Sequence, residues 1–114
     1  MAVHRELGAG FLERVYHEAL EIELEDRKIP YATNVNVTVR YRGRALSCQY
    51  RVDLMCFPDG EPILLELKAV SDITRAHRAQ VIHYMKATGI QRGLLVNFGA
   101  ASLQYERMVL GWGG

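Results

Sequence analysis

Two stretches of the chain predict helices. The first runs from Phe11 to about Arg27 and follows a glycine-containing loop. Its apolar stripe predicts an amphipathic helix and consists of Phe11, Leu12, Val15, Tyr16, Ala19, Leu20 and Ile22. A second helix is expected to follow the loop 69–74, which carries N-cap candidates, and to end at Gly89.

Other segments alternate apolar and polar residues, which is typical of strands with one buried face. The first such strand is half-buried and presents Val35, Val37, Val39 and Tyr41. Gly43 interrupts it, and the next strand is expected over 45–57. Residues 94–98 predict a short buried strand and residues 102–110 a final edge strand.

A hairpin is the clearest local signal. The β-forming runs 50–57 and 62–68 flank a Pro-Asp-Gly turn, a combination that favours an antiparallel pair. If the turn is centred between Asp59 and Gly60, Asp53 lies directly opposite Glu66.

The predicted order is α-β-β-β-α-β-β. The step from the third strand through the second helix to the fourth strand predicts a right-handed crossover and parallel pairing. The fold class is therefore α/β (α+β), with a mixed central sheet flanked by helices. At 114 residues the chain 1–114 is expected to be one domain, with a loosely held tail at 111–114.

The charge balance is not that of a strongly basic protein. The formal net charge is +1 with a pI near 7.8, so nucleic-acid contacts are expected to be local or supplemented by a partner. No apolar leader or membrane-length run occurs in the sequence, so a cytoplasmic protein without membrane association is expected.

The two cysteines fall on one predicted strand, eight positions apart. At about 3.3 Å per residue they would lie roughly 26 Å from each other, beyond disulfide reach. Cys48 and Cys56 share the apolar face of that strand, so both are expected to be buried free thiols.

Three ionisable residues of the hairpin are expected on one face, namely Asp53, Glu66 and Lys68. Two facing carboxylates are destabilising unless a positive charge lies between them, and such oxygen-rich sites suit Mg²⁺ or Mn²⁺. The alternative is an ordinary solvated strand face. Apolar neighbours on the same face favour a covered sheet with a polar pocket: Met55, Phe57 and Leu64.

Further polar residues allow two interpretations each. Glu13 lies at the margin of its helix's apolar stripe, where its carboxylate reaches either a neighbouring pocket or water. Gln80 and Tyr84 share a helix face, with His77 on the same edge, and this indicates either a part of the site or a helix flank that happens to be polar. A group of arginines indicates either edge protection or a phosphate-facing strip: Arg40, Arg42, Arg44 and Arg51.

The ordered set of motifs resembles a known family. An Asp on one strand, Glu66-Leu67-Lys68 on the next and Gln80-x-x-x-Tyr84 on the following helix resemble the RecB-type branch of the PD-(D/E)xK nuclease superfamily. The segment Gly10-x-x-Glu13-x-x-Tyr16 resembles the small bacterial GxxExxY protein family within it. Val52 stands where the motif's name has Pro. Family members also carry an additional helix before the segment at which this chain starts.

The resemblance implies a restriction-endonuclease-like core and a role for each matching residue. Asp53 and Glu66 would bind the metal, with the backbone carbonyl of Leu67 and the carboxylate of Glu13, direct or through water, as further ligands. Lys68 would position the attacking water or steady charge on the phosphate. The remaining motif residues would support the site or contact substrate: Gln80 and Tyr84.

These observations lead to a ranked set of functions. The first is a Mg²⁺- or Mn²⁺-dependent nuclease-like phosphodiesterase acting on nucleic acid, above all DNA. The second is a non-catalytic nucleic-acid or protein-interaction module that keeps the fold. The third is a structural subunit of a homodimer, with an apolar patch near the absent helix.

Overall fold

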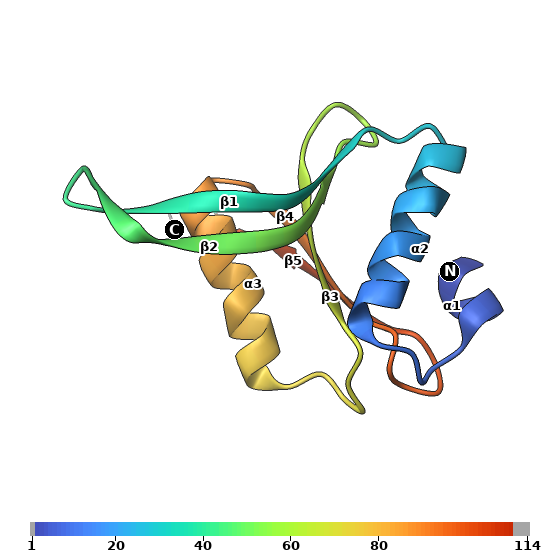
Figure 1. The fold of residues 1–114 in the computed structure, drawn as a ribbon. Helices are drawn as coiled ribbons and strands as arrows, with labels where there is room; N and C mark the ends of the chain where they lie inside the picture. Colours follow the sequence, from blue (N-terminus) through green and yellow to red (C-terminus); the bar gives the residue numbers. More distant parts are fainter. Residues whose placement is uncertain (1, 111–114) are drawn as a thin grey trace.

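The computed structural model describes residues 2–110, so the tail at 111–114 lies outside the described residues. It contains two helices, three strands, a helix and two further strands (Figure 1). Their bounds are α1 Ala2–Leu7, α2 Glu13–Asp26, β1 Tyr31–Tyr41, β2 Arg44–Cys56, β3 Ile63–Lys68, α3 Arg75–Thr88, β4 Arg92–Asn97 and β5 Gln104–Val109.

The strands form one mixed sheet in the order β1-β2-β3-β4-β5. β3 and β4 pair in parallel, and the other neighbours are antiparallel. In the β2–β3 hairpin Leu54 pairs with Leu65 and Met55 with Leu64. This is the register expected from a turn between Asp59 and Gly60, so the hairpin prediction is confirmed.

Helices cover both faces of the sheet, and each face has its own core. α1 and α2 lie on one side and α3 on the other (Figure 1). Tyr16 and Leu20 of α2 pack against Leu54 and Leu67. The α3 core contains Val81, Met85, Val52, Leu64 and Leu95.

The ends of α3 follow from its sequence. Thr74 is the N-cap, and its side chain and that of His77 form a reciprocal capping box. His77 is therefore used in capping rather than in a polar edge with Gln80 and Tyr84. Gly89 closes the helix in the left-handed region at φ 75°, where a residue without a Cβ fits best.

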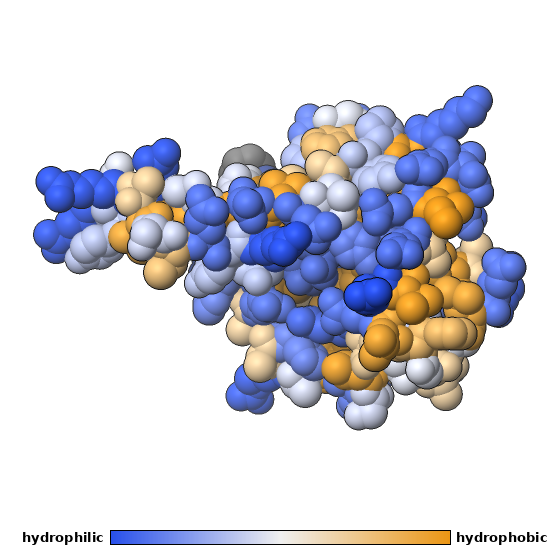
Figure 2. Space-filling model, in the orientation of Figure 1, coloured by the Kyte–Doolittle hydropathy of each residue, from blue (hydrophilic) through white to orange (hydrophobic). Residues whose placement is uncertain are grey.

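The outer halves of β1 and β2 project beyond both cores as a two-stranded arm, which we define as residues 38–49 (Figure 1). Every residue of β2 from Arg44 to Arg51 is exposed. Hydrophilic residues are prominent along the projection (Figure 2). The expectation that Cys48 is buried is therefore wrong, because no helix covers this part of the strand; Cys56, at the inner end, is buried.

The short helix α1 was not predicted. Its six residues span less than two turns, too few to display a helical repeat. Val3 is nevertheless buried in the α2 core, which explains why the segment is ordered against α2. Within residues 2–110, no helix has the length and apolar character needed to cross a membrane.

Candidate active site

The candidate site lies where β2 and β3 diverge. The regular pairing of the two strands ends at Leu54–Leu65. Beyond it, side-chain carboxylates instead of backbone carbonyls accept hydrogen bonds from the backbone N–H groups. The backbone N–H of Asp53 donates to Oε1 of Glu66 (3.2 Å), and the N–H of Leu67 donates to Oδ2 of Asp53 (2.9 Å). Each strand thus holds the acidic side chain of the other.

The two carboxyls differ in their exposure to water. Glu66 is only 3% exposed. Burial, and secondly the charge of Asp53, raise the pKa of the Glu66 carboxyl, although the N–H of Asp53 and the nearby ammonium of Lys68 oppose the shift. A buried carboxylate beside a second carboxylate must bind either a proton or a cation. The pair therefore has the electrostatic character of a cation site.

Lys68 extends the site toward α3. Its Nζ donates to Oε1 of Gln80 (3.0 Å), and Nε2 of Gln80 donates to the hydroxyl of Tyr84 (3.2 Å). The Tyr84 ring lies 5.0 Å from that of Tyr50 on β2, and burial raises the pKa of its hydroxyl. Gln80 thus joins the Lys68 ammonium to the Tyr84 hydroxyl, and the Gln-x-x-x-Tyr spacing brings these two side chains of α3 into contact.

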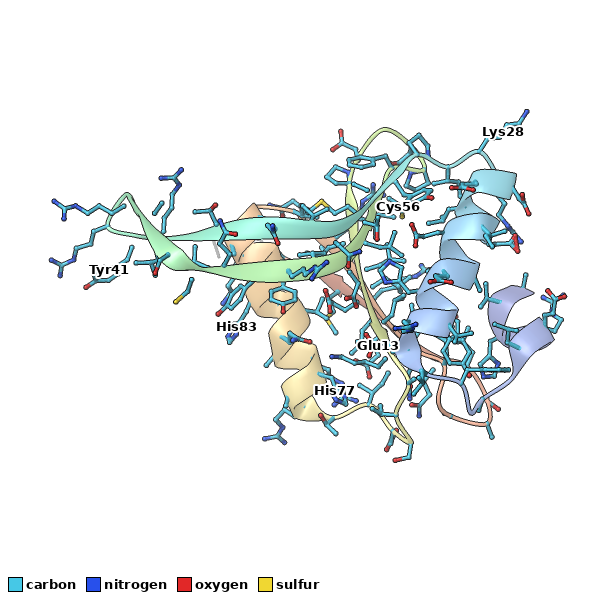
Figure 3. All side chains as sticks on the ribbon, in the orientation of Figure 1. Glu13, Lys28, Tyr41, Cys56, His77 and His83 are labelled. Carbon is cyan, nitrogen blue, oxygen red and sulfur yellow. The ribbon has the colours of Figure 1, made fainter. Side chains whose placement is uncertain are left out.

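Glu13 approaches the same site from the other helix layer. It is the first residue of α2 and lies beside β3 (Figure 3). Partial burial and the charge of Asp53 raise the pKa of the Glu13 carboxyl, while the charge of Lys68 lowers it. No three His, Cys, Asp or Glu side chains among residues 2–110 form a ready metal cluster. Glu13 is therefore an electrostatic neighbour of the carboxylate pair.

Tyr16 holds the start of α2 in place. Its hydroxyl donates to the carbonyl of Gly8 (2.6 Å) and accepts from the N–H of Phe11 (3.1 Å). Its ring is fully buried and stacks on Phe98 at 4.7 Å. The tyrosine thereby fixes the loop that leads into Glu13, which gives the Gly-x-x-Glu-x-x-Tyr spacing a physical purpose.

Asn97 was not among the predicted site residues, yet it holds the loop that follows Lys68. This fully buried side chain bonds the N–H and the carbonyl of Val70 (3.0 and 2.9 Å). A Cβ on Gly99 would lie 2.4 Å from the Val70 backbone, so only glycine allows this approach. The sequence signal that could have indicated this role is the position of Asn97, a polar residue directly after the apolar residues 94–96.

A second unpredicted contact supports Asp53 from α2. His17 shares a hydrogen bond with Oγ1 of Thr33 (2.7 Å), and that hydroxyl lies 3.4 Å from the carbonyl oxygen of Asp53. Neither residue belongs to a recognisable sequence motif. Their contact depends on the packing of α2 against β1, which local spacing does not reveal.

The available groups fit a small divalent cation. Two carboxylates are hard oxygen ligands of the kind that Mg²⁺ and Mn²⁺ prefer. Burial and the charge of Asp53 both disfavour the ionised form of Glu66, and a bound cation would offset that cost. An ammonium group beside such an ion can act on a substrate that carries negative charge.

Comparisons with known proteins identify the fold and the superfamily of the chain. Comparison with curated protein sequences yields no match. A solved structure titled "Crystal structure of SSO0001" shares the fold, with a TM-score of 0.68 and 18% identity; the match covers 84% of this chain and 50% of that chain. The sequence model described as "PD-(D/E)XK nuclease superfamily" matches residues 1–108. The chain belongs to the PD-(D/E)XK nuclease superfamily.

Proposed function

We propose that this protein is a metal-dependent hydrolase of phosphodiester bonds in nucleic acid, above all DNA, and that it belongs to the GxxExxY group of its superfamily. The observation that carries the proposal is the reciprocal bonding of Asp53 and Glu66 across the diverging strands. It places two carboxyls together at a point where Lys68 and Gln80 also meet.

The proposed cation is Mg²⁺ or Mn²⁺. Asp53, Glu66 and the backbone carbonyl of Leu67 would hold it, with Glu13 contributing directly or through a water molecule. Such an ion polarises the phosphate and acidifies a bound water. A substrate phosphate would complete its coordination, since Mg²⁺ is commonly bound by one or two carboxylates together with phosphate oxygens.

The protein's own groups have separate tasks in this proposal. Lys68 holds positive charge where negative charge grows on the phosphate, or orients the attacking water. Gln80 accepts a hydrogen bond from the ammonium and so directs it. Tyr84 holds Gln80 through its hydroxyl. Gln80 and Tyr84 are thus positioning residues for Lys68.

The experiment compares cleavage by wild type, Lys68→Ala and Lys86→Ala with Mn²⁺ on linear, nicked and single-stranded DNA and on RNA. Lys86 is an exposed lysine of α3 and serves as the matched control. Loss of one preorganised charge at the reacting centre should lower the cleavage rate by about 10²–10³-fold, whereas Lys86→Ala should cleave at the wild-type rate. Equal activity of wild type and Lys68→Ala, or an inert wild type on all substrates, would contradict the proposal.

A non-catalytic nucleic-acid-binding module is the second candidate. The observation that favours it is the exposed group of arginines on the arm and its surroundings, because phosphate contacts of this kind require no chemistry. Salt-dependent binding without cleavage under any metal condition would select this alternative.

A further inference from the structure

The small net charge conceals a strong separation of charge. Residues 31–52 contain four arginines and no acidic residue, and residues 73–105, which include α3, also contain none. By contrast, α2 carries six acidic residues against one arginine. The arm and α3 are therefore the basic side of the molecule, and α2 is the acidic side.

The arm's arginines lie at its tip, far from any compensating acid. Arg40 lies near the end of β1, and Arg42 and Arg44 lie at and after the turn. All three are exposed. Among residues 2–110 the ion pairs involve other side chains, so no carboxylate neutralises the tip. Such a surface attracts a polyanion.

The turn itself carries a residue that its geometry does not favour. Arg42 and Gly43 both have positive φ, 51° and 76°, which corresponds to a two-residue turn of type I′. Asn-Gly is the favoured sequence there, and a long side chain in the left-handed region is unfavourable. The turn thus carries a charged side chain at a position where its backbone geometry favours Asn.

The two pairs next to the turn place an arginine on each face of the arm. Arg40 pairs across the ribbon with Ala45, and Tyr41 pairs with Arg44. From Arg44, β2 runs through the exposed residues Leu46 and Cys48 to Tyr50, which contacts Tyr84 of the site; the register of the ribbon shifts between Thr38 and Arg40. Figure 3 shows Tyr41 near the arm's tip. The arm is thus connected to the site by one continuous strand.

We infer that the arm inserts into the major groove of double-stranded DNA and holds the duplex while another part of it lies at the Asp53–Glu66 site; this rests on the proposed action on nucleic acid. The B-form major groove, about 12 Å wide, admits a two-stranded ribbon. The A-form RNA groove is too narrow and deep for it. From Arg44 to Asp53 the strand extends about 30 Å, close to one turn of B-DNA at about 34–36 Å.

The test measures binding by fluorescence anisotropy in EDTA, where no hydrolysis occurs, on a 24-base-pair DNA duplex, a duplex RNA of equal length and a single strand. The arm variant is Arg40→Gln/Arg42→Asn/Arg44→Gln, in which Asn suits the positive φ. The control variant removes the same charge from exposed residues elsewhere, again with Asn at a positive φ: Arg5→Gln/Lys28→Asn/Arg107→Gln. Circular dichroism confirms that both variants are folded.

The arm variant should bind duplex DNA about 10–100-fold more weakly at low salt, and the slope of log K against log salt should fall by about 2–3, as expected from roughly 0.9 per phosphate contact. Duplex RNA and single strands should lose less than about threefold, as should the control variant on DNA. Unchanged DNA binding by the arm variant, an equal loss in the control, or equal losses on all three nucleic acids would overturn the inference.

The two proposals fail separately. Arm-dependent duplex binding without Mn²⁺-dependent cleavage would overturn the hydrolase and leave the arm's role intact. Cleavage by wild type together with unchanged DNA binding by the arm variant would overturn the arm's role alone. If removing the arginines causes aggregation but does not alter DNA binding, they protect the edge strand β1, and the inference is wrong.

Discussion

The inner and outer halves of β2 share one alternating pattern but have different environments. In the inner half Val52, Leu54 and Cys56 are buried against helices. In the outer half Leu46 and Cys48 are exposed, because the strand has passed beyond α2 and α3. The comparison shows that alternation alone does not tell which apolar residues are covered, or by which helix: Val52 lies in the α3 core and Leu54 in the α2 core, whereas Leu46 and Cys48 have no cover.

The largest expected effect concerns two leucines of this strand. Leu54→Ala should lower the free energy of unfolding by about 2–5 kcal/mol, because it removes a fully buried side chain and leaves a cavity. Leu46→Ala on the arm should change it by less than about 0.5 kcal/mol. Urea denaturation of both variants measures the difference. Similar losses would mean that the arm is packed in solution.

The next effect separates a buried tyrosine from an exposed one. Tyr16→Phe removes two hydrogen bonds, to Gly8 and from Phe11, and should cost about 1–3 kcal/mol of unfolding free energy. Tyr41→Phe, at the tip of the arm, serves as the control and should cost less than about 0.5 kcal/mol. Thermal unfolding followed by circular dichroism tests both. If Tyr16→Phe melts like wild type, the two hydrogen bonds of the Tyr16 hydroxyl to the loop before Glu13 do not stabilise the protein.

A pH dependence should distinguish the site from the arm, which has no carboxylate. The pKa of Glu66 is raised in the folded protein above its ordinary value of 4.5, so the folded state binds more protons than the unfolded state once the pH exceeds that value. The metal-free protein should therefore lose stability from this group as pH rises from about 4.5 through the raised pKa.

Urea denaturation in EDTA at a series of pH values measures this loss. Glu66→Gln should flatten the decline, because the amide does not titrate. An equally steep decline in Glu66→Gln would mean that other groups cause it.

The smallest effect concerns cysteine reactivity and involves no change in stability. Cys48 is exposed, whereas Cys56 is buried and burial raises the pKa of its thiol. A thiol-specific reagent should label Cys48 rapidly and Cys56 only on unfolding. The Cys48→Ser variant should show no fast labelling. Rapid reaction of both thiols in the native wild-type protein would show that the inner half of β2 opens.

Local patterns predicted much of this molecule because local physics decides those features. The turn chemistry at Asp59 and Gly60 set the hairpin register and hence the meeting of Asp53 with Glu66. Gly89 ended its helix as expected. In each case residues close in sequence determine the backbone geometry.

The remaining features depend on tertiary packing. Cys48 was placed in a core because spacing does not reveal where helix cover stops. Local spacing does not predict the contact of His17 with Thr33 or the hydrogen bonds between Asn97 and Val70. Each of these contacts joins segments that meet only in the folded chain. The unequal burial of the two carboxyls likewise became clear only from the assembled layers.

Calorimetric titration with Mn²⁺ tests the central claim most directly, with wild type, Asp53→Asn and Asp59→Asn compared. Asp59 is an exposed aspartate in the β2–β3 turn, paired with Arg92, and controls for a lost surface charge. We predict that wild type and Asp59→Asn bind one ion alike and that Asp53→Asn does not bind it. Unchanged binding by Asp53→Asn, or no binding by wild type, would contradict a cation site between residues 53 and 66.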